Sequence, residues 1–240
     1  MPTLRRADIT LEYDVHGTGH PLLLLAPGGM RSARAFWQRA PFDPVREFSP
    51  QYRVISMDQR NAGGSRAPIT AADGWHSYAE DQLALLDELG VERCHLLGGC
   101  IGGAFALSLI ARAPERVSCA VLQQPIGYSG SNRQVFYELF DGWAAELKQT
   151  RSDIPEAALA PFRSHMYDAD FVFSVSREVV ATCPVPLLVL RGNDVYHPSS
   201  TSEEIVRLAP RAELIQDWKT ADHLPAALSH VRRFLSEHSP

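Results

Sequence analysis

The stretch HLLGGCIGGAFALSLIARAPERV, residues 95–117, decides the fold. It begins as an apolar run and continues with a helical pattern, and a single cysteine stands between two pairs of glycines where the two meet. A short apolar run bounded by glycine predicts a buried strand, and apolar residues three and four apart predict a helix. We therefore expect a strand over 94–99, a tight turn at Cys100 and a helix over 101–113.

The same alternation of strand and helix continues along the chain in both directions. Strands are expected at 9–15, 21–26, 52–58, 94–99, 117–123, 185–192 and 212–216, and helices at 32–40, 75–89, 101–113, 200–209 and 225–236. Each connection is long enough for a right-handed crossover between parallel strands. The pattern predicts an α/β fold, with a mostly parallel central sheet and helices on both faces.

One segment interrupts this alternation. Residues 127–182 separate two expected strands and are aromatic and amphipathic, as in VFYELFDGWAAELKQ. A structureless connection of that length is improbable inside a compact domain. The sequence predicts a core formed by residues 1–126 and 183–240, with 127–182 inserted as a small helical cap over the strand ends.

Composition excludes several classes of function. The chain has 240 residues, 45% of them hydrophobic, which fits one domain or one domain with an insertion. The net charge is −5 and the basic residues are scattered, so neither nucleic acid nor a membrane surface is an expected partner. The N-terminus turns polar before any apolar segment of signal-peptide length, which favours a cytoplasmic location. The expected partner is a small-molecule substrate, and a homodimer stays open.

The four cysteines indicate neither disulfides nor zinc. Cys94, Cys100, Cys119 and Cys183 form no CxxC pair and no zinc-finger spacing with histidine. Free thiols in a reducing compartment are the simplest interpretation. No metal and no other cofactor is expected.

The stretch around Cys100 fits the pattern glycine-x-nucleophile-x-glycine, and it resembles the nucleophile elbow of the α/β-hydrolase fold. Gly98 and Gly102 would let strand and helix approach without Cβ clashes. At the helix N-terminus the thiolate of Cys100 is favoured, and the N–H of Ile101 would face a developing oxyanion. The alternative is a packing cysteine on an inactive relative, because cysteine is often buried.

Two further segments resemble the family's loops in the expected order. In APGGMRS, residues 26–32, proline replaces the usual histidine and Gly29 falls on the oxyanion-hole position, with Met30 as the other candidate for the second N–H. The turn MDQRNAGGS, residues 57–65, resembles a turn that braces these loops in the family. The resemblance thus implies an oxyanion hole formed by Gly29 and Ile101.

The acid and the base follow the nucleophile in the chain, as this fold requires. LVLRGNDVYHP, residues 188–198, resembles the family's strand-then-acid segment and implies Asp194 as the acid. KTADHLPAAL, residues 219–228, places His223 where the family's histidine sits, just before the terminal helix. The implied catalytic triad is Cys100, His223 and Asp194.

Candidates for substrate binding come from the loops and the expected cap. They are Met30, His197, Phe140, Trp143 and Tyr167. His197, three residues after the expected acid, could touch substrate or simply brace its loop. Aromatic residues at helical spacing could line a chamber or pack the cap against the core, and both interpretations stay open.

The family resemblance covers residues 9–125 and 184–237 and implies a hydrolase. A cysteine in the elbow is similar to that of dienelactone hydrolases and of the polyhydroxyalkanoate synthase type of acyltransferase. The expected reaction is cleavage of a small ester, lactone or thioester through an acyl-thioester intermediate. Acyl transfer or carbon–carbon bond hydrolysis on the same triad is the alternative, and a non-catalytic ligand receptor is a third class.

Overall fold

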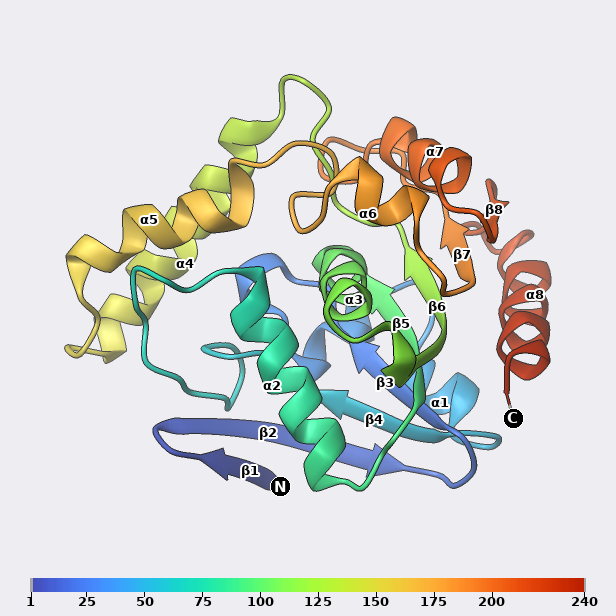
Figure 1. The fold of residues 1–240 in the computed structure, drawn as a ribbon, viewed down its shortest axis with the longest axis horizontal. Coiled ribbons are helices and arrows are strands. Elements are labelled where there is room, and N and C mark those ends of the chain that lie inside the picture. The colour runs from blue at the N-terminus through green and yellow to red at the C-terminus, as the bar shows by residue number, and fades with distance from the viewer. Residues whose placement is uncertain (1, 240) are drawn as a thin grey trace.

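Eight strands form one sheet at the centre of the computed structural model, which describes residues 2–239 (Figure 1). Their order across the sheet is β1-β2-β4-β3-β5-β6-β7-β8. The strands are β1 (Thr3–Arg6), β2 (Ile9–His16), β3 (Pro21–Leu25), β4 (Arg53–Met57), β5 (Cys94–Gly99), β6 (Val117–Gln123), β7 (Leu187–Leu190) and β8 (Ala212–Ile215). β2 pairs antiparallel with both of its neighbours, β1 and β4. The other neighbouring strands, in the order β4-β3-β5-β6-β7-β8, pair parallel. The expected mostly parallel sheet is confirmed.

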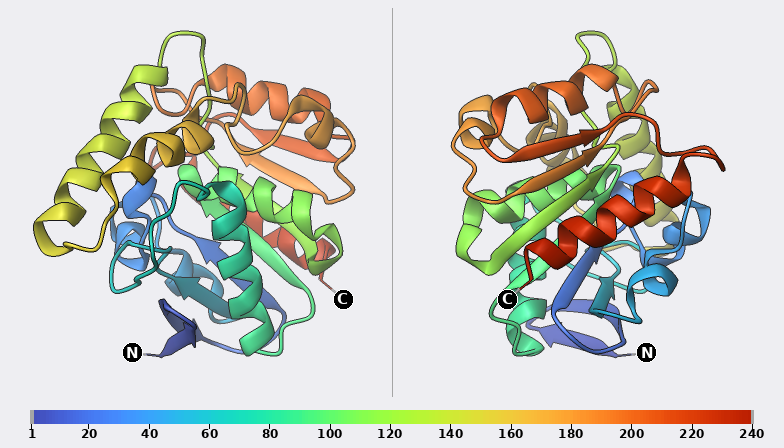
Figure 2. Two further views of the ribbon diagram at one scale, coloured as in Figure 1. Left: turned by 60° about the vertical axis from the view of Figure 1, so that its left-hand side comes forward. Right: turned by 90° about the vertical axis from the view of Figure 1, so that its right-hand side faces the viewer.

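Helices cover both faces of the sheet (Figure 2). They are α1 (Pro44–Phe48), α2 (Trp75–Glu88), α3 (Ile101–Arg112), α7 (Ser199–Leu208) and α8 (Leu224–Glu237), with short 3₁₀ helices η1 (Gly29–Arg31), η2 (Arg34–Arg39) and η3 (Pro114–Arg116). α2, α3 and α7 pack on one face and α1 and α8 on the other. The helix expected at 32–40 is therefore the shorter 3₁₀ helix η2.

Strand β3 shows why the sheet has two cores. Leu22 and Leu24 belong to the cluster beneath α1 and α8, whereas Leu23 and Leu25 belong to the cluster beneath α2 and α3. All four are fully buried. Alternate side chains of a strand point to opposite faces, so a parallel strand covered on both sides is apolar throughout.

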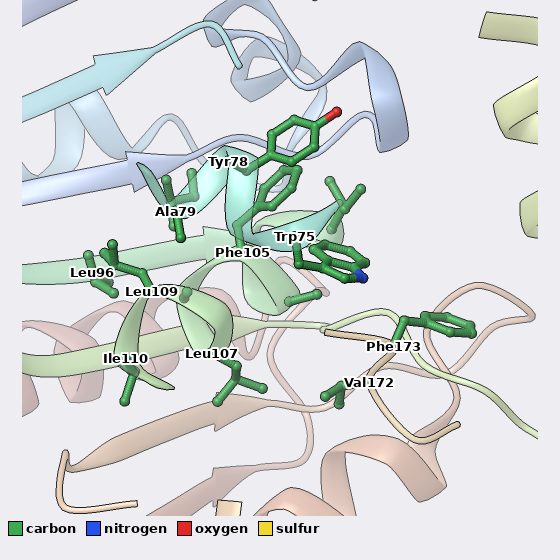
Figure 3. Packing of buried hydrophobic residues seen from close by; sticks show 14 of the residues in the cluster. Trp75, Tyr78, Ala79, Leu96, Phe105, Leu107, Leu109, Ile110, Val172 and Phe173 are labelled. Carbon is green, nitrogen blue, oxygen red and sulfur yellow. The ribbon is translucent and has the colours of Figure 1, made fainter. Parts of the chain in front are cut away.

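Aromatic packing joins helices α2 and α3 (Figure 3). The ring of Tyr78 stacks on that of Phe105 with centroids 4.6 Å apart, and Trp75 meets the same ring edge-on at 5.4 Å. Trp75 also donates a hydrogen bond from Nε1 to the carbonyl oxygen of Met166, at 3.0 Å. This bond ties α2 to the segment that follows β6.

Residues 127–182 leave the sheet after β6 and return to the neighbouring strand β7. They contain α4 (Arg133–Thr150), α5 (Glu156–Tyr167) and α6 (Arg177–Ala181). α4 and α5 pack against each other beyond one end of the sheet, and α4 also contacts η1 (Figures 1 and 2). We call α4 and α5 the cap helices; the division of the chain into core and cap stays a prediction. Within residues 2–239, no helix is both long and apolar enough to cross a membrane.

Candidate active site

Cys100 occupies a strained turn between β5 and α3. Its backbone angles are φ 57° and ψ −119°, in a region that residues with a side chain rarely adopt and that costs about 1–3 kcal/mol. A Cβ on Gly98 would lie 2.2 Å from the Gly102 carbonyl oxygen, and one on Gly102 would lie 1.9 Å from that of Leu25. The close approach predicted for these two glycines is confirmed, and it holds Cys100 at the strand's carboxyl end.

A cavity of about 180 Å³ opens beside Cys100. Its lining comes from the η1 loop, the elbow, the cap helices and the loops after β6 and β7: Gly28, Gly29, Met30, Arg31, Cys100, Ile101, Ile126, Phe136, Leu139, Tyr167, Tyr196 and His197. Most of these side chains are apolar, and the polar groups are few. A small, largely apolar cavity of this kind suits a small organic substrate. A larger hollow of about 610 Å³ lies beside Arg34, but no cysteine lines it.

His197 is buried and is held by Asp194. Its Nδ1 lies 2.9 Å from Asp194 Oδ2. The backbone N–H groups of Tyr196 and His197 both donate to Asp194 Oδ1 at 3.0 Å, and the main chains of Asp194 and His197 exchange two hydrogen bonds of 3.2 Å. This tight turn fixes the imidazole, and His197 Nε2 is buried without a hydrogen-bond partner among residues 2–239.

The electrostatics link Cys100 to this imidazole. Burial raises the pKa of the Cys100 thiol, but the interaction with the His197 imidazole, together with the backbone groups of Gly28 and Ile101, outweighs burial and lowers that pKa. Burial lowers the pKa of His197, yet Cys100 and then Asp194 raise it above its ordinary value. Burial also raises the pKa of Asp194, but His197 lowers it overall. The three groups therefore favour a thiolate beside an imidazolium.

The structure brings Cys100 and Asp194 to His197, and it places His223 elsewhere. His223 is an exposed residue at the start of α8, and its Nδ1 lies 2.8 Å from Thr220 Oγ1. It does not line the cavity of Cys100, and no hydrogen bond within residues 2–239 joins it to Cys100 or Asp194. The Asp194 carboxylate hydrogen-bonds instead within its own turn, to the backbone of Tyr196 and to the backbone and imidazole of His197.

The expected oxyanion loop lies at the cavity. Gly29, Met30 and Ile101 all line it, together with Gly28, whose backbone hydrogen-bonds to the Cys100 sulfur. A backbone group that stabilises a thiolate must be an N–H donor, so the N–H groups of Gly28 and Ile101 point to the reacting position. Gly28 was missed because the family pattern directs attention to the residue after it.

The expected substrate-binding residues divide into two groups. Tyr167 lines the cavity, as Met30 and His197 do. Phe140 and Trp143 do not line it; both are buried and pack edge-on against Phe162, and Trp143 Nε1 donates to the Asn61 carbonyl oxygen at 3.1 Å. For these two residues the helical spacing serves packing of the cap.

Cys100 is expected to react with iodoacetamide at neutral pH faster than the other three cysteines. Burial raises the pKa of Cys94 to about 12 and also raises those of Cys119 and Cys183, whereas that of Cys100 is lowered. The thiolate is the reactive form, so the rate at Cys100 should rise with pH through a midpoint below the ordinary thiol range. Peptide mapping after brief labelling from pH 5 to 10 measures this. A rate at Cys100 no higher than that at Cys183 would contradict the thiolate.

The chain is similar to known proteins over most of its length. Residues 21–206 match the family described as the α/β hydrolase fold. A protein of Stutzerimonas stutzeri, provisionally named a carbamate hydrolase, is 26% identical over 230 residues, covering 89% of this chain and 83% of the relative. A 2-hydroxymuconate semialdehyde hydrolase of a Pseudomonas species is 32% identical over 254 residues, covering 92% and 88%.

Solved structures have the same architecture. The meta-cleavage product hydrolase of Pseudomonas fluorescens superposes with a TM-score of 0.74 at 22% sequence identity, covering 99% of this chain and 98% of that one. Similarity at that identity establishes the shared fold. Together with the family match, it confirms the architecture that the elbow stretch predicts.

Proposed function

Because the chain belongs to the α/β-hydrolase-fold family, we propose that it hydrolyses a small ester, lactone or thioester with Cys100 as the nucleophile. The family match and the relative named for carbamate hydrolysis support a hydrolase acting on ester-type bonds. The observation that carries the finer proposal is that Cys100, in a strained elbow, lines the same cavity as His197, which lowers the pKa of its thiol.

The geometry supports a two-step reaction. The Cys100 thiolate attacks the substrate carbonyl, and the N–H groups of Gly28 or Gly29 and of Ile101 hold the oxygen as it gains charge. His197 gives its proton to the leaving alkoxide or thiolate as the carbon–oxygen or carbon–sulfur bond breaks, which leaves an acyl thioester on Cys100. The neutral imidazole then removes a proton from water, and the hydroxide attacks the thioester to release a carboxylic acid and restore the thiolate.

Two histidines are candidates for the base. The structure favours His197 as the base, because it is buried near Cys100 and hydrogen-bonded to Asp194. The order of motifs along the chain favours His223, in the triad Cys100, His223 and Asp194. We propose His197 as the base, and variants of the two residues can separate the assignments.

A second candidate activity is favoured by one comparison. The relative named 2-hydroxymuconate semialdehyde hydrolase is 32% identical to this chain over 92% of its length, a higher identity than that of the relative named for carbamate hydrolysis, at 26%. The same nucleophile and base could serve carbon–carbon bond hydrolysis. Acyl transfer differs from hydrolysis only in the final acceptor.

An acyl group from 4-nitrophenyl acetate is expected to accumulate on Cys100. A thiolate expels an activated aryloxide readily, so thioester formation should outrun its hydrolysis and give a burst of nitrophenolate. Acid quenching, intact mass and peptide mapping would locate one acetyl group on Cys100. Turnover is then compared with an enol lactone, an acyl thioester and a semialdehyde, with and without an added thiol or alcohol.

The outcomes separate the candidates. Release of free acid in water alone supports hydrolysis, and product formed only with an acceptor would assign acyl transfer. Preferential turnover of the semialdehyde would favour the second candidate. An acetyl group on another residue, or none at all, would contradict nucleophilic catalysis by Cys100.

A further inference from the structure

Besides His197, the cavity lining contains one basic residue, Arg31. Arg31 follows Gly29 by two residues, and its side chain is 31% exposed. The cavity lining contains no aspartate or glutamate. A substrate in this space therefore meets one permanent positive charge that no lining carboxylate neutralises.

The guanidinium of Arg31 is only partly used by the protein. Its Nε and Nη2 donate to the two carboxylate oxygens of Glu146 on α4, at 2.6 and 2.7 Å. A guanidinium has five N–H donors, and within residues 2–239 its Nη1 makes no hydrogen bond. The donors on Nη1 are therefore available for a further anion.

Glu146 competes for these donors from outside the cavity lining. The pair is bidentate, which strengthens it, but the Glu146 side chain is 60% exposed, so water and salt screen the interaction. A substrate carboxylate in the cavity can bind the donors that Glu146 leaves free or compete with it for the others.

We propose that Arg31 binds a carboxylate of the substrate, so that the substrate class is a short ester, lactone or thioester that carries one negative charge. Phe136, Leu139 and Tyr196 would then contact the carbon chain between the carboxylate and the scissile bond. Naming this class rests on the proposed hydrolytic function. The cavity of about 180 Å³ favours a short acyl group.

The test compares two esters of nearly equal size, 4-nitrophenyl butyrate and mono-4-nitrophenyl succinate, which differ by a carboxylate. Arg31→Gln is expected to lower the ratio of their kcat/KM values, anionic over neutral, by about tenfold, a typical effect for one charge-assisted hydrogen-bonded pair. Glu146→Gln should raise the same ratio, because the competing carboxylate is removed. Arg163→Gln is the matched control: Arg163 pairs with Asp141 across the cap helices and does not line the cavity, so the ratio should stay unchanged.

Binding provides a readout that does not depend on turnover. The 4-nitroanilides of succinate and of butyrate replace the esters, and calorimetry on wild type and Arg31→Gln gives their Kd values. A preference for the anion that Arg31→Gln removes supports the inference, even if the protein cleaves neither ester and the hydrolytic function fails. An unchanged preference in both assays overturns the inference, and ester cleavage that still needs Cys100 leaves the hydrolytic function standing.

Discussion

Replacing Cys100 with alanine is expected to lower kcat for the best ester by at least about a thousandfold, as loss of the nucleophile does in other triad enzymes. In the proposed mechanism the thiolate forms the covalent intermediate, and no other lining side chain of the cavity is a thiol or hydroxyl group of comparable nucleophilicity. Steady-state hydrolysis is the measurement. Cys100→Ser should keep part of the activity, since the elbow also positions a hydroxyl.

The control for this substitution is a buried cysteine away from the cavity. Cys183→Ala removes the same atom from a residue that is 4% exposed, and the rate should stay within about twofold. Circular dichroism must show that Cys100→Ala is folded. An alanine variant that is folded and turns over at the wild-type rate would refute nucleophilic catalysis by Cys100.

His197→Gln is expected to lower kcat by about 10²- to 10⁴-fold, the usual range for loss of a general acid or base, and His223→Gln should have a much smaller effect. His197 is bonded to Asp194 and acts on the Cys100 thiol, whereas His223 is exposed and bonded to Thr220. The two variants make the same chemical change, so each is the control for the other.

Thiol titration adds a readout that a loss of packing would not change. In His197→Gln the midpoint of Cys100 alkylation should move to higher pH, because the interaction with the imidazole that lowers the thiol pKa is lost. In His223→Gln the midpoint should not move. If His223→Gln proved the more damaging change and also shifted the midpoint, the base would be His223, as the order of motifs indicates.

Most of the sheet could be predicted because its strands are short apolar runs bounded by glycine or polar residues. β5 and β6 have the bounds expected from the sequence, 94–99 and 117–123. The edge strand β1 (TLRR) was missed, since four residues with three polar side chains carry no strand signal. Helix α1 was missed for a similar reason: it has only five residues.

The elbow was predictable from the sequence because neighbouring residues fix its geometry. The histidine partner of Asp194 was less predictable because it depends on the conformation of a loop and of a side chain. The glycines around Cys100 fix the elbow through steric contacts between neighbouring elements, so the motif alone placed it. The partner of Asp194 depends on a tight turn and on which side of a loop an imidazole occupies. The spacing Asp-x-x-His was the available signal for this pair, but the same spacing also occurs in loops where the two residues have only a structural role. Similarity to dienelactone hydrolases rests on the elbow cysteine and stays a prediction.

At Cys100 the positive φ brings the requirements of folding into conflict with those of the proposed chemistry. A residue without a Cβ would adopt φ 57° at almost no cost, so selection for stability alone would place glycine there. The chain instead keeps a side chain in a conformation that costs about 1–3 kcal/mol, a noticeable fraction of the 5–15 kcal/mol that typically separates folded from unfolded protein. If Cys100 is the proposed nucleophile, the chain gives up thermodynamic stability at this residue in exchange for reactivity. Engineering for heat resistance should therefore gain its stability at positions other than this one.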